Sequence, residues 1–149
     1  ALSVRTTAEG TLLDAGHNGY ARRYGMVVRR RLFLSADGSE VAGEDLIEAA
    51  PARLLARRSE RGFDVRFHLG AGVSATPTAD GLGALLKSPG GRIWAFKLRI
   101  EAGSGRLQIE PSLWVDAEGT IHRTQQLVIS GSTDKCAADI HWSLTRAGK

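Results

Sequence analysis

The chain has 149 residues and one cysteine, which excludes an internal disulfide and any metal site built from several cysteines. Its 20 basic and 16 acidic residues give a net charge of +4, which favours contact with polyanions. The sequence shows no zinc-finger spacing and no basic helix with apolar periodicity, so nucleic acid is not an expected partner.

We expect residues 1–149 to form a single domain belonging to a longer protein, because the chain begins without an initiator methionine or a signal sequence. No apolar run is long enough to cross a bilayer, so membrane insertion is not expected. The residues themselves carry no signal for a cellular location.

Polar and apolar residues alternate with a period of two along most of the chain, which predicts antiparallel strands. The expected strands span residues 2–7, 11–15, 26–36, 40–46, 73–79, 82–88, 92–101, 106–114, 120–130 and 137–145. Residues 48–58 have helical character, and they fit a short helix or a surface loop equally well. We therefore predict an all-β fold, an antiparallel β-sandwich of about eight to ten strands with little helix.

Three short segments predict tight turns between these strands: Asp37-Gly38, Asp80-Gly81 and Pro89-Gly90-Gly91. The three tryptophans, at positions 94, 114 and 142, lie in alternating strands where we expect burial. Cys136 is interpreted as a small strand residue.

The four histidines, at positions 17, 68, 122 and 141, do not pair with one another at metal-ligand spacing, so no metal site is expected. His68, His122 and His141 are interpreted as strand residues that each have a hydrogen-bond partner. No G-x-S-x-G elbow and no phosphate-binding loop is present, so the sequence predicts neither a catalytic residue nor a cofactor.

The segment from His17 to Tyr20 lies in a turn, where functional residues are common. In one interpretation, which we prefer, His17 and Tyr20 stabilise the turn through backbone hydrogen bonds while the Tyr20 ring plugs the sandwich edge. In the other, these two side chains face a sugar or a neighbouring catalytic domain.

Arginines are densest at positions 22, 23, 29, 30 and 31. Strand alternation points Arg29 and Arg31 to one side and Arg30 to the other. The cluster is either a cationic strip for uronate or sulfate groups, or an intramolecular ion-pair network completed by Glu44 and Asp45, which we prefer.

Several motifs follow one another in a distinctive order. They are His17-Asn18-Gly19-Tyr20, the Arg29-Arg30-Arg31 strand, Gly43-Glu44-Asp45, Arg66-Phe67-His68-Leu69, the Trp94 strand, Arg123-Thr124-Gln125-Gln126 and Ile129-Ser130-Gly131. Together they resemble the C-terminal β-domain of the heparinase II/III-like polysaccharide lyases over nearly the whole chain.

The resemblance implies a parent protein that cleaves uronic-acid-containing polysaccharides, heparin-like, heparan-sulfate-like or alginate-like, by β-elimination. The family's catalytic and zinc-binding residues belong to an upstream helical toroid and a His-rich motif, and neither is present here. The chain would then support that upstream catalytic domain, and whether the parent is an active lyase stays open. A periplasmic or cell-envelope location is implied by the resemblance alone.

The candidate residues for binding an acidic polysaccharide in that role are His17, Tyr20, Arg22, Arg23, Arg29 and Arg31. Two alternatives stay open. One is a stand-alone carbohydrate-binding module, which needs a flat row of exposed aromatic rings; the other is a purely structural or oligomerisation domain.

Overall fold

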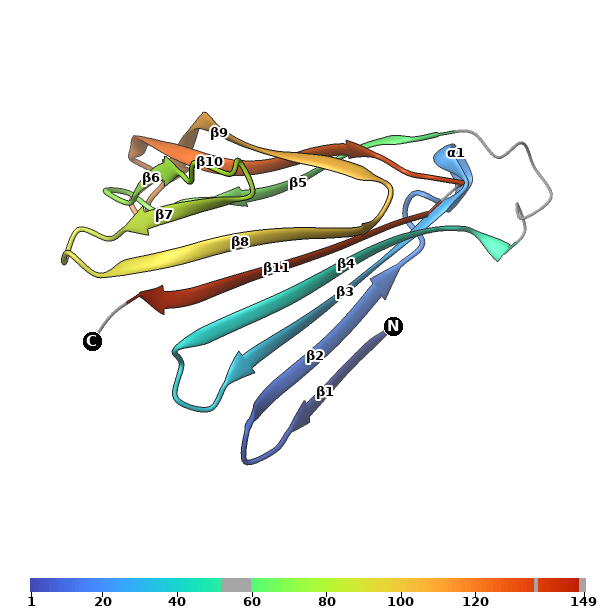
Figure 1. Cartoon of the computed structure of the whole chain (residues 1–149), viewed down its shortest axis with the longest axis horizontal. Helices are drawn as coiled ribbons and strands as arrows, with labels where there is room; N and C mark the ends of the chain where they lie inside the picture. Colours follow the sequence, from blue (N-terminus) through green and yellow to red (C-terminus); the bar gives the residue numbers. More distant parts are fainter. Residues whose placement is uncertain (52–59, 136, 148–149) are drawn as a thin grey trace.

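The computed structural model describes residues 1–51, 60–135 and 137–147 and shows two antiparallel sheets (Figure 1). The elements are β1 (Leu2–Thr6), β2 (Gly10–His17), α1 (Ala21–Tyr24), β3 (Met26–Ser35), β4 (Glu40–Ala49), β5 (Gly62–His68), β6 (Ser74–Pro77), β7 (Gly83–Lys87), β8 (Ile93–Ala102), β9 (Ser104–Val115), β10 (Ile121–Ser132) and β11 (Ala137–Ala147). The all-β prediction is confirmed. The described ranges contain the strands β1 to β11, slightly more than the eight to ten strands expected.

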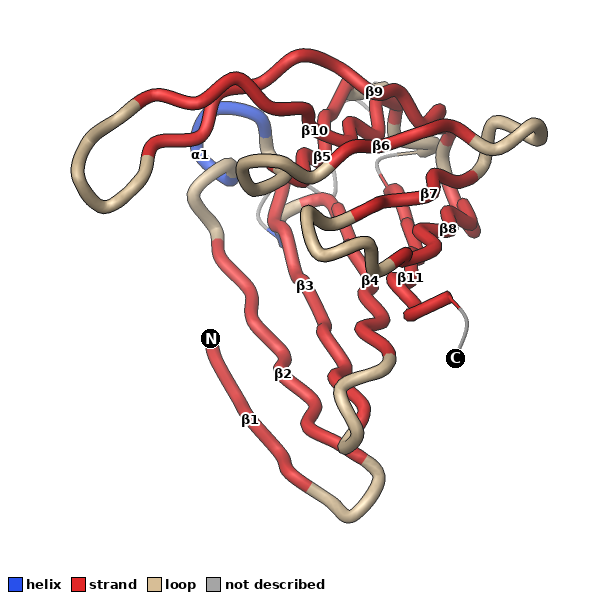
Figure 2. The backbone as a smooth tube through the Cα atoms, turned by 90° about the vertical axis from the view of Figure 1, so that its left-hand side faces the viewer, coloured by secondary structure: helices blue, strands red, loops and turns tan. Residues whose placement is uncertain are grey.

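The larger sheet has eight strands in the order β1-β2-β3-β4-β11-β8-β7-β6, and the smaller has three in the order β5-β10-β9. The last strand, β11, lies between β4 and β8 and so joins the N-terminal strands to the β6–β8 strands. Figures 1 and 2 both show β1 and β2 at the edge of the larger sheet that lies away from β9 and β10.

The core lies between the two sheets, and on β11 alternation sends one side chain in two inward. On β11, Ile140 is 0% exposed, and on β10 Leu127 and Ile129 are 1% and 0% exposed. Burying a side chain of this size contributes about 1.5–3 kcal/mol. The residues between the buried ones on β11, Asp139 and His141, consequently lie on the outer face of the larger sheet.

The three predicted turns are confirmed. Gly38, Gly81 and Gly91 have φ angles of 67°, 70° and 79°, a left-handed conformation that glycine adopts without steric cost. Of the segment 48–58, residues 48 and 49 end β4, whereas residues 52–59, like Cys136, lie outside the described residues.

The prediction of burial is correct for Trp142, which is 8% exposed, but wrong for Trp114, which is 40% exposed. Trp114 lies near the end of the β9–β10 hairpin, where its neighbour Leu113, on the opposite face, is 60% exposed. Both faces of this hairpin end therefore contact solvent, and alternation along the strand does not reveal that. Across the described ranges, no helix has the length and apolar character needed to span a membrane.

Candidate functional site

A buried polar cluster joins β3, β4 and β11 on the inner face of the larger sheet. Arg30 donates two hydrogen bonds to Asp45, from Nε to Oδ1 at 2.6 Å and from Nη2 to Oδ2 at 2.9 Å. The indole Nε1 of Trp142 donates a third to Asp45 Oδ2 at 3.0 Å. Asp45 is only 3% exposed, so these bonds supply the partners that a buried carboxylate requires.

Aromatic rings surround this cluster. The Arg30 guanidinium carbon lies 5.7 Å from the centroid of Phe67 and 6.0 Å from a Trp142 ring centroid, within the range of cation–π attraction. Gly43 leaves the space that the Trp142 ring occupies, since a Cβ atom there would come within 2.2 Å of the ring. Two residues of the Gly-Glu-Asp motif thus have structural roles: Gly43 leaves room for the Trp142 ring, and Asp45 accepts its hydrogen bond.

On the outer face, Arg29 and Arg31 are also paired. Arg29 makes a two-point contact with Asp14, and Arg31 Nη1 lies 2.9 Å from Glu44 Oε2 while its Nε lies 3.5 Å from Asp14 Oδ2. The hydrogen bond from Arg29 is the main cause that lowers the pKa of Asp14 below 3.8. The preferred interpretation, an intramolecular ion-pair network completed by Glu44 and Asp45, is confirmed for Arg30 and Arg31.

The turn after β2 brings His17, Tyr20 and Tyr24 together. Nδ1 of His17 accepts a hydrogen bond from the Gly19 N–H at 3.2 Å, which confirms that His17 stabilises the turn. The ring centroids of His17 and Tyr20 are 5.3 Å apart, and those of Tyr20 and Tyr24 are 6.0 Å apart. Tyr20 is 50% exposed, so the expectation that its ring plugs the sandwich edge is wrong.

The two tyrosines meet edge to face, with an angle of 60° between their rings. The stand-alone carbohydrate-binding module needs a flat row of rings, and this pair does not form one. Arg23 lies beside the pair, its guanidinium carbon 5.3 Å from the Tyr24 ring centroid, and both Arg22 and Arg23 are exposed.

An open pocket of about 860 Å³ lies between β5 and the inner face of the larger sheet. Its lining comes from β2, α1, β3, β4 and β5 and from residues just before α1, before β5 and after β10. It comprises Ala15, Gly16, His17, Tyr20, Tyr24, Met26, Val28, Arg30, Asp45, Ile47, Glu60, Arg61, Gly62, Phe63, Asp64, Val65, Arg66 and Thr133. Its size falls within the range of about 300–1,000 Å³ that is typical of small-molecule sites. A hydrogen bond from Ser130 and one from Arg66 lower the pKa of Asp64, so its carboxylate is ionised at neutral pH.

The six residues expected to bind polysaccharide are divided between two surfaces. His17 and Tyr20 line the pocket, and Arg22 and Arg23 lie on α1 beside them. Arg29 and Arg31 lie on the opposite face of the larger sheet, because they pair with β2 residues that point outward. Binding of a polysaccharide by any of the six stays a prediction.

Two of the other three histidines, His68 and His122, have the expected hydrogen-bond partner, whereas His141 lies 2.9 Å from Asp139 without a hydrogen bond. Nδ1 of His68 lies 2.8 Å from the Ser112 hydroxyl, and Nε2 of His122 lies 2.7 Å from Oδ2 of Asp116. The hydrogen bond with His122 is the main cause that lowers the pKa of Asp116.

His141 lies close to two carboxylates, Asp139 and Glu44, and these are the one group of three possible metal ligands within the described ranges. The spacing of the histidines relative to one another gives no signal for this group, because two of its three possible ligands are carboxylates. The Asp-x-His spacing on β11, which places both side chains on one face of a strand, was the available signal.

A family model described as "Heparinase II/III-like, C-terminal" matches residues 1–143. The chain belongs to this family. Among curated proteins, this heparinase II/III-like chain is 33% identical over 142 residues to FtsZ-localized protein C of Caulobacter vibrioides (strain NA1000 / CB15N). That match covers 93% of the chain and 24% of the relative, so the chain spans about a quarter of the relative's length.

Two solved structures share the fold. The crystal structure of Heparinase III matches with a TM-score of 0.74 and 12% identity, over 98% of this chain and 21% of that one. A mutant of the heparan sulfate lyase HepC from Pedobacter heparinus matches with a TM-score of 0.77 and 8% identity, over 97% of this chain and 21% of that chain. At these identities the likeness shows the fold alone, and the matched part is about a fifth of each larger protein.

Proposed function

We propose that this chain is the supporting β-sandwich of a longer protein that cleaves uronic-acid-containing polysaccharides by β-elimination. The family match and the likeness in fold to Heparinase III and to a heparan sulfate lyase support this role. β-Elimination needs a base, a proton donor for the leaving oxygen and a group that neutralises the uronate carboxylate. We assign these catalytic groups to the remainder of the parent protein.

The observation that carries the supporting role is an uncovered apolar surface on the inner face of β1. All five residues of this strand are exposed, and alternation places Leu2 and Val4, at 70% and 60% exposure, on the face that elsewhere forms the core. Leu34 at the end of β3, also on the inner face, is 48% exposed. Clustered exposed apolar side chains are typical of contact surfaces, so we assign this one to the neighbouring catalytic domain.

The pocket beside α1 would form part of the substrate cleft. Tyr20 supplies a half-exposed aromatic ring for a sugar, while Arg22 and Arg23 supply guanidinium groups whose fork matches a uronate carboxylate or a sulfate. In this arrangement Arg29 and Arg31 would contact polysaccharide only from the opposite side of the sheet, in competition with Asp14 and Glu44.

Two lysine substitutions on β1 test the docking surface. Val4→Lys adds a charge to the inner face, whereas its matched control Ser3→Lys adds the same charge to the outer face, opposite Asp14. Both positions are exposed in this chain, so the isolated chain should tolerate either change. In the parent protein, Val4→Lys should lower the unfolding temperature and Ser3→Lys should not; equal tolerance of both in the parent would contradict the proposed docking.

Activity assays test the second half of the proposal. The parent protein should release unsaturated uronate products, detected by their ultraviolet absorbance, from heparin, heparan sulfate or alginate, and the isolated chain should release none. Product formation by the isolated chain that is lost in His17→Ala would make this segment catalytic in its own right.

A second candidate function rests on the curated relative, whose 33% identity far exceeds the 8–12% of the two lyase structures. In this case the parent would localise with FtsZ, and the β-sandwich would support a domain with no lyase activity. Co-sedimentation of the parent with FtsZ filaments, together with inactivity on all three polysaccharides, would favour this candidate over the lyase.

A further inference from the structure

The outer face of the larger sheet carries a row of ionisable residues that crosses five strands. Strand pairing places Asp14 on β2 opposite Arg31 on β3, Arg31 opposite Glu44 on β4, Glu44 opposite His141 on β11, and His141 opposite Arg99 on β8. Residues directly opposite on one face of a sheet are near neighbours. His141 therefore lies between a carboxylate and a guanidinium on the two flanking strands.

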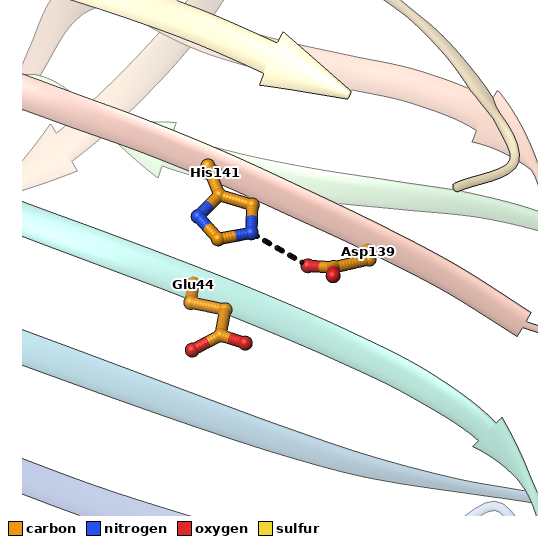
Figure 3. Close-up of side chains that lie close together, drawn as sticks. All are labelled: Glu44, Asp139 and His141. Carbon is orange, nitrogen blue, oxygen red and sulfur yellow. Dashed lines mark ion pairs between the residues drawn. The ribbon is translucent and has the colours of Figure 1, made fainter. Parts of the chain in front are cut away.

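Three possible metal ligands gather within this row, as Figure 3 shows: Glu44 from β4 and, two residues apart on one face of β11, Asp139 and His141. One ligand atom from each residue lies within 4.8 Å of the other two. His141 Nε2 is the nearest to a carboxylate, at 2.9 Å from Asp139 Oδ1. All three residues are half-buried, which leaves the group open to an ion from solvent.

One oxygen of this group lacks the partner that burial demands. Oδ1 of Asp139 is shielded from solvent yet accepts no hydrogen bond from any described residue. Although His141 Nε2 lies 2.9 Å away, the contact does not have the geometry of a hydrogen bond. An unsatisfied buried acceptor is energetically unfavourable, and a cation bound between the three side chains would supply the missing partner.

We propose that Glu44, Asp139 and His141 bind one divalent transition-metal ion, with Zn²⁺ preferred. Two carboxylates balance its charge, and an imidazole nitrogen favours zinc over calcium or magnesium, which select oxygen ligands. Zinc bonds of about 2.0–2.2 Å in a tetrahedron separate the ligand atoms by about 3.4 Å, so small side-chain rotations suffice. With three protein ligands, a fourth position stays available to water.

Arg31 is compatible with this site as an outer partner of Glu44. Its Nη1 donates to Oε2 at 2.9 Å and to Oε1 at 3.3 Å, which leaves each carboxylate oxygen a further lone pair. Hydrogen bonds of this kind commonly orient a metal-binding carboxylate. Arg31 also lies 3.5 Å from Asp14, so its charge is shared with a second carboxylate.

Calorimetric titration of Zn²⁺ into the chelator-treated chain of 149 residues tests the proposal. We expect one Zn²⁺ per chain, and a fall in affinity of at least about tenfold in His141→Ala, Asp139→Asn and Glu44→Gln. Co²⁺ substituted for Zn²⁺ should give a visible absorption spectrum that His141→Ala abolishes. Far-ultraviolet circular dichroism verifies that each variant is folded.

His122→Ala is the matched control, because His122 also lies close to an aspartate, at 2.7 Å, but has no third ligand within the described ranges. This variant should bind Zn²⁺ as the unchanged chain does. The proposal is overturned if the unchanged chain binds no stoichiometric Zn²⁺, or if binding persists in all three site variants.

Discussion

Replacement of Asp45 by alanine should destabilise the chain strongly, because Asp45 accepts hydrogen bonds from both Arg30 and Trp142. Loss of one partner from a fully buried ion pair costs about 3–5 kcal/mol. The Arg30 side chain is 39% exposed and water can solvate it, which reduces this part of the cost to about 1 kcal/mol. The buried Trp142 N–H, left without an acceptor, adds about 1–3 kcal/mol. We therefore expect Asp45→Ala to lower the free energy of unfolding by about 2–4 kcal/mol.

Urea denaturation followed by far-ultraviolet circular dichroism measures this loss. With a slope of about 2 kcal/mol per molar urea, typical of a domain of this size, the midpoint should fall by roughly 1–2 M. Asp14→Ala is the control, since Asp14 also pairs with arginine but on the exposed outer face, and its midpoint should move far less. Equal shifts for Asp45→Ala and Asp14→Ala would refute the conclusion that the inner cluster stabilises the fold.

Three further predictions concern single features of the chain. Gly43→Ala should lower the free energy of unfolding by about 1–3 kcal/mol, because its Cβ collides with Trp142. Adding Trp142→Leu to the same chain should recover part of that loss. If thermal unfolding shows that the effects of the two substitutions simply add, the collision is contradicted. Hydrogen bonds from Ser39 and Ser35 lower the pKa of Asp37 to about 2. Between pH 3.8 and 2 the unfolded state therefore binds more protons than the folded state. The stabilising effect of Asp37 is present above pH 3.8 and is lost as the pH falls towards 2. The stability difference between the unchanged chain and Asp37→Asn should shrink over that interval, with Glu9→Gln as an exposed control, and a constant difference would exclude this cause. Charge reversal of Arg22 and Arg23 should lower the salt concentration needed for elution from immobilised heparin, and unchanged retention would show that these two arginines are not the contact.

The features that the sequence determines by itself are those that neighbouring residues encode. Alternation with a period of two is a property of a single strand, so it revealed the all-β fold and the opposite orientations of Arg30 and Arg31. The Asp37-Gly38 turn could be predicted for a similar reason, because glycine adopts positive φ angles wherever it occurs. The family resemblance also came from the sequence alone, because it depends on short motifs and on their order along the chain.

The tertiary structure decided which strands lie beside one another, and the candidate sites depend on that pairing. β11 inserts between β4 and β8, which places Trp142 against Asp45 and His141 against Glu44, although these residues are far apart in the sequence. The same arrangement leaves the inner face of β1 uncovered and the β9–β10 hairpin end exposed at Trp114. Alternation tells which side chains share a face, but the partner of that face comes from long-range packing, whose contacts no local pattern encodes.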